Sequence, residues 1–117
     1  MVCTILKRHG EGVIITRSRT KVVDEQELHP TEKNGWYLLQ TNTDSWKEPF
    51  YLDDRRTPGK QCMEKLGREN LSFTGILQVL SSPTTLNKLT IFTSIMDTDS
   101  GEIQTFIQKC PDPCWPW

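Results

Sequence analysis

The stretch from Thr41 to Pro58 combines residue types that could serve acyl-transfer chemistry. It holds Asn42 and, further on, four consecutive charges, Asp53 to Arg56. A neutral amide can donate a hydrogen bond to a developing oxyanion, and arginine can hold a nucleophile or a carboxylate with its planar fork of donors. Alternatively, Asn42 stabilises a turn and the charges form a surface loop of weak salt bridges. The spacing alone favours this second interpretation.

Three large rings, Trp46, Phe50 and Tyr51, lie in the same stretch. Buried rings beside charges require each charge to be paired. A solvated loop would leave these rings without a use; if the stretch instead builds a site, we expect rings and charges to share a partly buried wall. The sequence offers no competing Ser/His/Asp order, phosphate-binding glycine loop or HExxH helix.

The four cysteines stand at positions 3, 62, 110 and 114. Two prolines stiffen the ring Cys110-Pro-Asp-Pro-Cys114, which favours a local disulfide worth about 2 kcal/mol in the chain-entropy estimate. A metal site is the alternative, but it needs two further ligands, and His9 and His29 lack a zinc-like spacing. We assign neither histidine a role.

Two features point to a longer secreted or lysosomal precursor. Asn70-Leu71-Ser72 is an N-glycosylation sequon, which places the chain in the secretory pathway. The apolar start, Met1–Leu6, is too short for a signal peptide and is followed by Lys7-Arg8. We therefore expect this chain to be the C-terminal piece of a larger polypeptide.

The elements that would position these residues follow the order strands, helices, strands. Val2–Leu6 and Gly12–Arg17 predict a hairpin around a polar turn at Lys7–Gly10, and His29–Gly35 predicts a second turn. The other predicted strands are Lys21–Leu28, Trp36–Thr41, Leu89–Met96 and Glu102–Lys109. The last two should form a hairpin with Gly101 in its turn.

Two helices are predicted in the middle of the chain. Thr57 can cap the first, with Pro58 at its first position and Gly67 at its end. Ser72 can cap the second, which ends at Ser81-Ser82-Pro83. The apolar face of the second helix is predicted to be Phe73, Ile76, Leu77 and Leu80.

This order predicts an α+β fold in which two helices cover one face of an antiparallel sheet. The 117 residues, 35% of them hydrophobic, suffice for one domain spanning 1–117. A net charge of −1 without charged blocks indicates neither a nucleic-acid partner nor a basic membrane patch. No apolar run is long enough for a transmembrane segment.

Several motifs together resemble the C-terminal part of the β-subunit in the acid ceramidase family. They are Gly10–Arg19, Gly35–Asn42, Trp46-Lys47, Leu52–Pro58, Glu69–Phe73, Leu86–Thr90 and Cys110–Cys114. Residues 1–9 fit poorly. The resemblance implies an N-terminal nucleophile amidohydrolase of the cholylglycine hydrolase-like type, and hence an incomplete αββα sandwich.

The resemblance also implies roles for particular residues. Asn42 would be the oxyanion donor and Arg55 the active-site arginine. Cys110 and Cys114 would form a local disulfide, Cys62 would bridge to the α-subunit, and Asn70 would carry a glycan.

The implied substrate is ceramide, cut in the lysosome into sphingosine and a fatty acid without a cofactor. The implied partners are the rest of the β-subunit, the α-subunit and a saposin-type lipid-presenting protein. The family's nucleophile is a cysteine opening a Cys-Thr-Ser stretch, whereas Cys3-Thr4-Ile5 lies in a predicted core strand. We therefore expect this chain alone to be inactive. The alternative is a non-catalytic, truncated isoform that binds lipid or protein.

Overall fold

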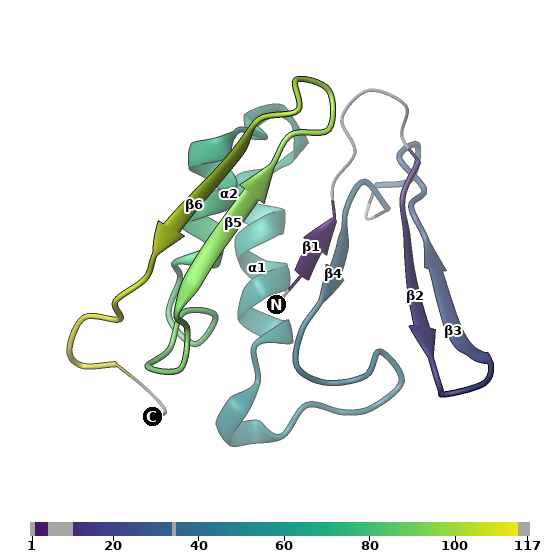
Figure 1. The fold of residues 1–117 in the computed structure, drawn as a ribbon, viewed down its shortest axis with the longest axis horizontal. Helices are drawn as coiled ribbons and strands as arrows, with labels where there is room; N and C mark the ends of the chain where they lie inside the picture. Colours follow the sequence, from purple (N-terminus) through teal and green to yellow (C-terminus); the bar gives the residue numbers. More distant parts are fainter. Residues whose placement is uncertain (1, 5–10, 34, 115–117) are drawn as a thin grey trace.

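The described part of the chain is a mixed α+β structure, as the sequence predicts. The computed structural model describes residues 2–4, 11–33 and 35–114, the first three by their backbone alone. The elements are β1 (Val2–Thr4), β2 (Val13–Arg17), β3 (Val22–Glu27), β4 (Leu38–Gln40), α1 (Arg56–Leu66), α2 (Phe73–Leu80), β5 (Phe92–Met96) and β6 (Ile103–Ile107) (Figure 1). The predicted turn at Lys7–Gly10 lies outside the described residues.

The described strands form three separate antiparallel pairs, where one sheet was expected. The predicted hairpin of the first two strands is wrong, because β1 pairs with β4, placing Cys3 opposite Leu39. β2 pairs with β3 instead, since the Ser18 N–H bonds the Lys21 carbonyl at 2.9 Å and closes a tight turn between them. A local turn therefore decides the partner of β2.

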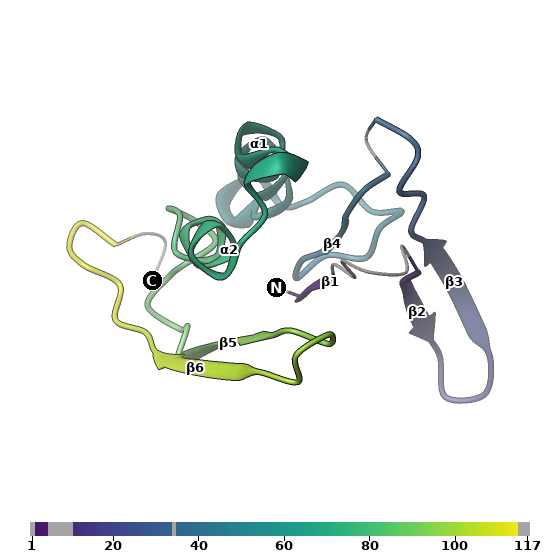
Figure 2. The ribbon, with the colours of Figure 1, turned by 90° about the horizontal axis from the view of Figure 1, so that it is seen from above.

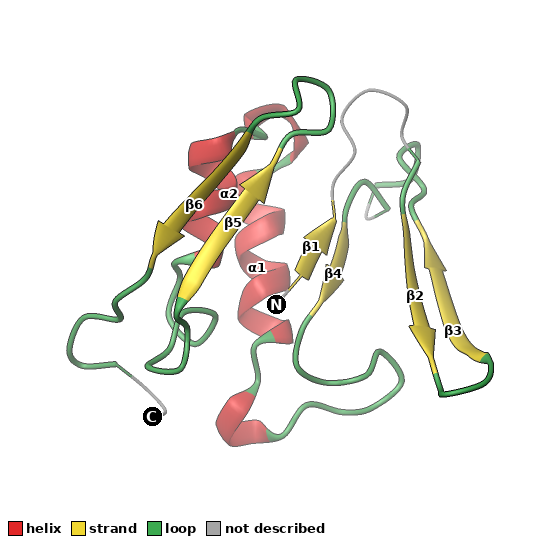
Figure 3. Cartoon of the chain, in the orientation of Figure 1, coloured by secondary structure: helices red, strands yellow, loops and turns green. Residues whose placement is uncertain are grey.

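The helices lie together on one side of β1–β4 and β5–β6, as the view from above shows (Figure 2), and β2–β3 stands apart from them. Figure 3 shows the same division by element type. The core between β4 and the helices is formed by Tyr37, Met63 and Val79. No helix among the described residues is long and apolar enough to span a membrane.

Helix α2 begins and ends where predicted. Its most deeply buried residues are not those of the predicted apolar face, which is half-buried, with Ile76 packed against the core. The Ser72 hydroxyl accepts the Gly75 N–H at 3.1 Å, which caps the helix. Gly75 and Val79 are buried, whereas Phe73 and Leu77 are only half-buried. Because Gly75 lacks a side chain, α1 can approach that face closely.

Gly75→Ala is expected to destabilise the chain by about 1–3 kcal/mol, because the added methyl overpacks the helix contact. An ideal Cβ at Gly75 would lie 2.8 Å from Leu66 Cδ1 and 3.1 Å from the Asn70 carbonyl oxygen. Urea unfolding measures the change, with Thr74→Ala at an exposed neighbouring position as the control. Equal stability of the two variants would contradict the close approach.

The β5–β6 hairpin presents an apolar face away from the helices. The side chains on this face are Phe92, Met96, Ile103 and Ile107, which are 61%, 64%, 64% and 90% exposed. Their strand register pairs Phe92 with Ile107 and Met96 with Ile103. No described element covers this face.

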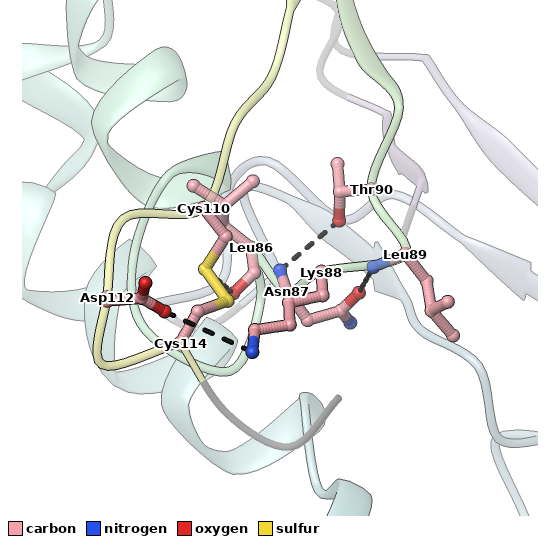
Figure 4. The surroundings of a disulfide bond; sticks show 8 residues. All are labelled: Leu86, Asn87, Lys88, Leu89, Thr90, Cys110, Asp112 and Cys114. Carbon is pink, nitrogen blue, oxygen red and sulfur yellow. Dashed lines mark hydrogen bonds and ion pairs between the residues drawn. A yellow bond between two sulfur atoms is a disulfide. The ribbon is translucent and has the colours of Figure 1, made fainter.

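A disulfide joins Cys110 to Cys114 after β6, the pair that the sequence favoured (Figure 4). The ring lies against the loop after α2, where Cys110 Sγ is 3.7 Å from the Leu86 carbonyl oxygen. An exposed ion pair between Lys88 and Asp112, at 4.0 Å, joins the same two segments. The disulfide thus closes a ring within residues 110–114, and this ring contacts the loop that leads into β5.

Candidate functional site

One carboxylate, that of Asp53, holds together the two residues with predicted catalytic roles. Asn42 follows β4, and its Nδ2 donates to Asp53 Oδ2 at 2.8 Å. The Arg55 guanidinium donates to the same carboxylate, from Nε to Oδ1 at 2.8 Å and from Nη2 to Oδ2 at 3.2 Å. The short 3₁₀ helix η1 (Tyr51–Asp53) brings Asp53 back beside the end of β4. The structure therefore places Asn42 and Arg55 side by side.

The charges in this cluster balance each other. The side chains of Arg55 and Asp53 are only 18% and 23% exposed, so this ion pair is better shielded from solvent than a surface pair. Without Arg55, the Asp53 carboxylate would leave a negative charge beside the Asn42 amide. The guanidinium offsets that charge, so the amide can face a developing negative charge.

Arg56 points to a different target from Arg55. Its guanidinium donates to the backbone carbonyls of three residues in the loop after Asn42: Thr43 at 3.1 Å, Asp44 at 2.7 Å and Lys47 at 2.8 Å. The two adjacent arginines are thus not interchangeable. Arg55 binds a side chain, and Arg56 binds the loop backbone.

Asp54 fixes the start of α1, two residues earlier than Thr57 would. Its Oδ1 accepts the backbone N–H groups of Arg56 at 2.9 Å and Thr57 at 3.0 Å. The predicted cap at Thr57 is therefore wrong, and Pro58 lies at the third helical position. Proline is tolerated there because the first N–H groups of a helix have no intrahelical partner.

Burial of Asp54 opposes its ionisation. Hydrogen bonds from the Thr57 side chain and from the Thr57 and Arg56 backbone outweigh burial and, with the charge of Arg56, lower the pKa of the carboxyl. Because the pKa of Asp54 is lower in the folded chain, its ionised form stabilises the fold fully above the unfolded pKa of about 3.9. This stabilisation is lost as the pH falls through the folded pKa. The cap should therefore hold at neutral pH and fail only in strong acid.

Asp54→Ala is expected to lower the free energy of unfolding by about 1 kcal/mol at pH 7, because α1 loses its cap. The difference from the wild type should shrink as pH falls below about 3.9, as the wild-type carboxyl protonates. Urea unfolding at a series of pH values measures it. Asp99→Ala, in the exposed turn after β5, is the control. If the difference in unfolding free energy between Asp54→Ala and the wild type stayed the same in acid, Asp54 would not be the cap of α1.

The predicted buried wall of rings is not present in the structure. Trp46, Phe50 and Tyr51 are 52%, 57% and 80% exposed, and Phe50 packs edge-to-face on Tyr51 with ring centroids 5.0 Å apart. The charges achieve their pairing through carboxylates, backbone N–H groups and carbonyls, and they need no aromatic cover. All three rings are exposed, and only Phe50 and Tyr51 are seen to pack on each other.

Cys62 and Asn70 belong to a second region, away from this cluster. Both line a hollow of about 360 Å³ between α1 and α2, whose other lining residues are Lys65, Leu66, Gly75, Gln78 and Val79. Cys62 is a half-buried free thiol. Asn70 is exposed, and its Nδ2 donates to the Leu66 carbonyl at 2.9 Å. Over the described ranges, no group of three or more His, Cys, Asp or Glu residues could hold a metal.

Comparison with known proteins gives a consistent result. The chain is 50% identical to acid ceramidase from Bos taurus over 109 residues and 48% identical to acid ceramidase from Mus musculus over 112 residues. It is 47% identical to the Homo sapiens enzyme over 108 residues. This chain is homologous to acid ceramidase. The matches cover 92–95% of the chain but only 27–28% of the acid ceramidases. No protein-family model matches the chain.

The homology to acid ceramidase agrees with the resemblance carried by the motifs, and the structure adds two residues. Asp53 joins Asn42 to Arg55, and Arg56 holds the adjacent loop. One signal in the sequence pointed to these two residues, the run of four charges from Asp53 to Arg56. The sequence could not show which partner each charged residue binds, because these contacts depend on where α1 begins.

Proposed function

We propose that this chain is the part of an acid ceramidase-type amidohydrolase that supplies the oxyanion donor and the arginine of the active site. The reaction is hydrolysis of the amide bond of ceramide to sphingosine and a fatty acid. The observation that carries the proposal is the shared Asp53 carboxylate, which sets the Asn42 amide and the Arg55 guanidinium beside each other.

Asn42 is suited to stabilise an oxyanion. Its Nδ2 carries two hydrogens, and the Asp53 carboxylate takes one at 2.8 Å. The other contact, to the Asp53 carbonyl oxygen, is 3.5 Å and lies at the outer limit of a hydrogen bond. The second N–H is therefore available to a substrate oxygen, while the first fixes the plane of the amide.

The nucleophile in this proposal is a cysteine thiolate from another part of the family's polypeptide, activated by its own α-amino group. The thiolate attacks the amide carbon and forms a tetrahedral oxyanion, which Asn42 binds. The C–N bond then breaks, sphingosine leaves with a proton, and water hydrolyses the acyl thioester. Arg55 has five N–H donors, of which Asp53 engages two, so the guanidinium can also steady the thiolate.

The remaining assignments are part of the same proposal. Residues 1–117 form one domain that completes an αββα sandwich, in which a second sheet covers the apolar face of β5–β6. Cys62 bridges to an α-subunit, Asn70 carries a glycan, and the complete protein works in the lysosome with a saposin-type partner. This chain alone is inactive because it lacks the nucleophile.

A hybrid enzyme tests the proposed function. In bovine acid ceramidase, the 109 matching residues are replaced by those of this chain. The hybrid should release fatty acid from ceramide, and the isolated chain should release none. A folded hybrid without activity would contradict the proposal and favour a non-catalytic lipid- or protein-binding role, which the exposed face of β5–β6 would then serve.

A further inference from the structure

The loop of residues 43–47 is arranged around one cation. The Arg56 guanidinium lies within hydrogen-bond distance of its three carbonyl oxygens, those of Thr43, Asp44 and Lys47. The Asp44 carbonyl also accepts the Lys47 N–H at 3.0 Å, so the loop closes into a turn at the same place. Three carbonyl dipoles therefore point their negative ends toward the guanidinium.

Convergent carbonyls repel one another unless a donor lies between them. The planar fork of Arg56 meets this need, because Nη1 takes the Lys47 carbonyl and Nη2 takes the other two. Lysine would keep the charge but could not reproduce the fork. The loop should therefore lose its shape when Arg56 is replaced, even by lysine.

The backbone of Arg56 is also fixed. It is the first residue of α1, and its N–H is held by Asp54 Oδ1 at 2.9 Å. The side chain thus connects the start of a helix to the loop that follows Asn42 directly in sequence. Gln40 Nε2 shares one of these acceptors, because it donates to the carbonyls of Thr41 and Thr43, each at 3.1 Å.

We propose that Arg56 is a positioning residue, which fixes the 43–47 loop and through it the orientation of the Asn42 amide. The proposal rests on the proposed function, in which that amide binds the oxyanion. Arg56 makes no contact with substrate in this account. Its effect on catalysis passes through Asn42.

The first test needs no enzymatic activity and uses the chain itself. The side-chain amide resonances of Asn42, assigned by their loss in Asn42→Ala, should shift and broaden in Arg56→Lys. They should remain unchanged in the control Arg68→Lys, because Arg68 donates to a single distant carbonyl, that of Pro30, at 2.8 Å. Unchanged Asn42 resonances in Arg56→Lys would overturn the proposal, whether or not the chain serves an enzyme.

The methyl resonance of Met63, which is fully buried, reports whether the fold survives. It should be the same in the wild type and in Arg56→Lys. Its loss would show a general structural role for Arg56 and would also overturn the proposal.

The second test uses the hybrid enzyme. Arg56→Lys should lower kcat about 10-fold with little change in KM, since the lost hydrogen bonds involve a charged donor. Added to Asn42→Ala, the same change should lower kcat by less than about twofold, because residues that act as one unit are not additive. Full additivity of the two effects would contradict a role through Asn42.

Discussion

Asn42→Ala in the hybrid enzyme is expected to lower kcat by about 10²–10³-fold, the usual cost of removing one oxyanion donor. KM should change little, because the bond to Asn42 strengthens only as the oxyanion forms. Initial rates of fatty acid release over a range of ceramide concentrations separate the two constants.

The matched control for Asn42→Ala is Gln104→Ala. Gln104 Nε2 donates to the Glu102 carboxylate at 2.6 Å, so the control also removes an amide-to-carboxylate bond, but in β6. Its kcat should equal that of the unmodified hybrid. An Asn42→Ala rate equal to that of the control would remove Asn42 from the oxyanion site.

Arg55→Lys is expected to lower kcat/KM by about 10- to 100-fold, a range that corresponds to hydrogen bonds with a charged donor. Lysine preserves the charge but cannot donate to both oxygens of Asp53 as the guanidinium does. The Asp53 carboxylate would then be held less firmly, and the Asn42 amide with it.

The stability of the same variant shows whether the loss is catalytic. In urea unfolding, Arg55→Lys should lose less free energy of unfolding than the free energy that corresponds to its drop in kcat/KM. Arg68→Lys is the control for removing a guanidinium elsewhere. Normal turnover by Arg55→Lys would refute the role of Arg55. A loss of activity fully explained by unfolded protein would reduce that role to structure.

Sequence motifs correctly predicted those helix ends and turns that depend only on neighbouring residues. Ser72 caps α2, Gly67 ends α1 with its N–H on the Met63 carbonyl, and Gly101 takes a positive φ of 73° in the last hairpin. Each depends on contacts within a few residues. Strand pairing does not, and β1 pairs with β4 across more than thirty positions of the sequence.

The candidate site shows the same difference between contacts of neighbouring residues and contacts distant in sequence. Motifs pointed to Asn42 and Arg55, but the residue that joins them, Asp53, lies eleven positions from Asn42 and reaches it through η1. The sequence could not separate the role of Arg56 from that of Arg55, because the predicted helix began at Pro58, with Thr57 as its cap. Once α1 begins at Arg56, the two arginine side chains leave the backbone in different directions and bind different partners.

A crystal structure of the hybrid enzyme treated with a long-chain fatty aldehyde would show whether Asn42 binds the oxyanion. The aldehyde forms a hemithioacetal with the nucleophilic thiolate, and its oxygen occupies the place of the oxyanion. We expect Asn42 Nδ2 to lie about 2.7–3.1 Å from this oxygen, with Asp53 still joining Asn42 to Arg55. An adduct oxygen bound by other donors, with Asn42 and Arg55 facing solvent, would contradict it.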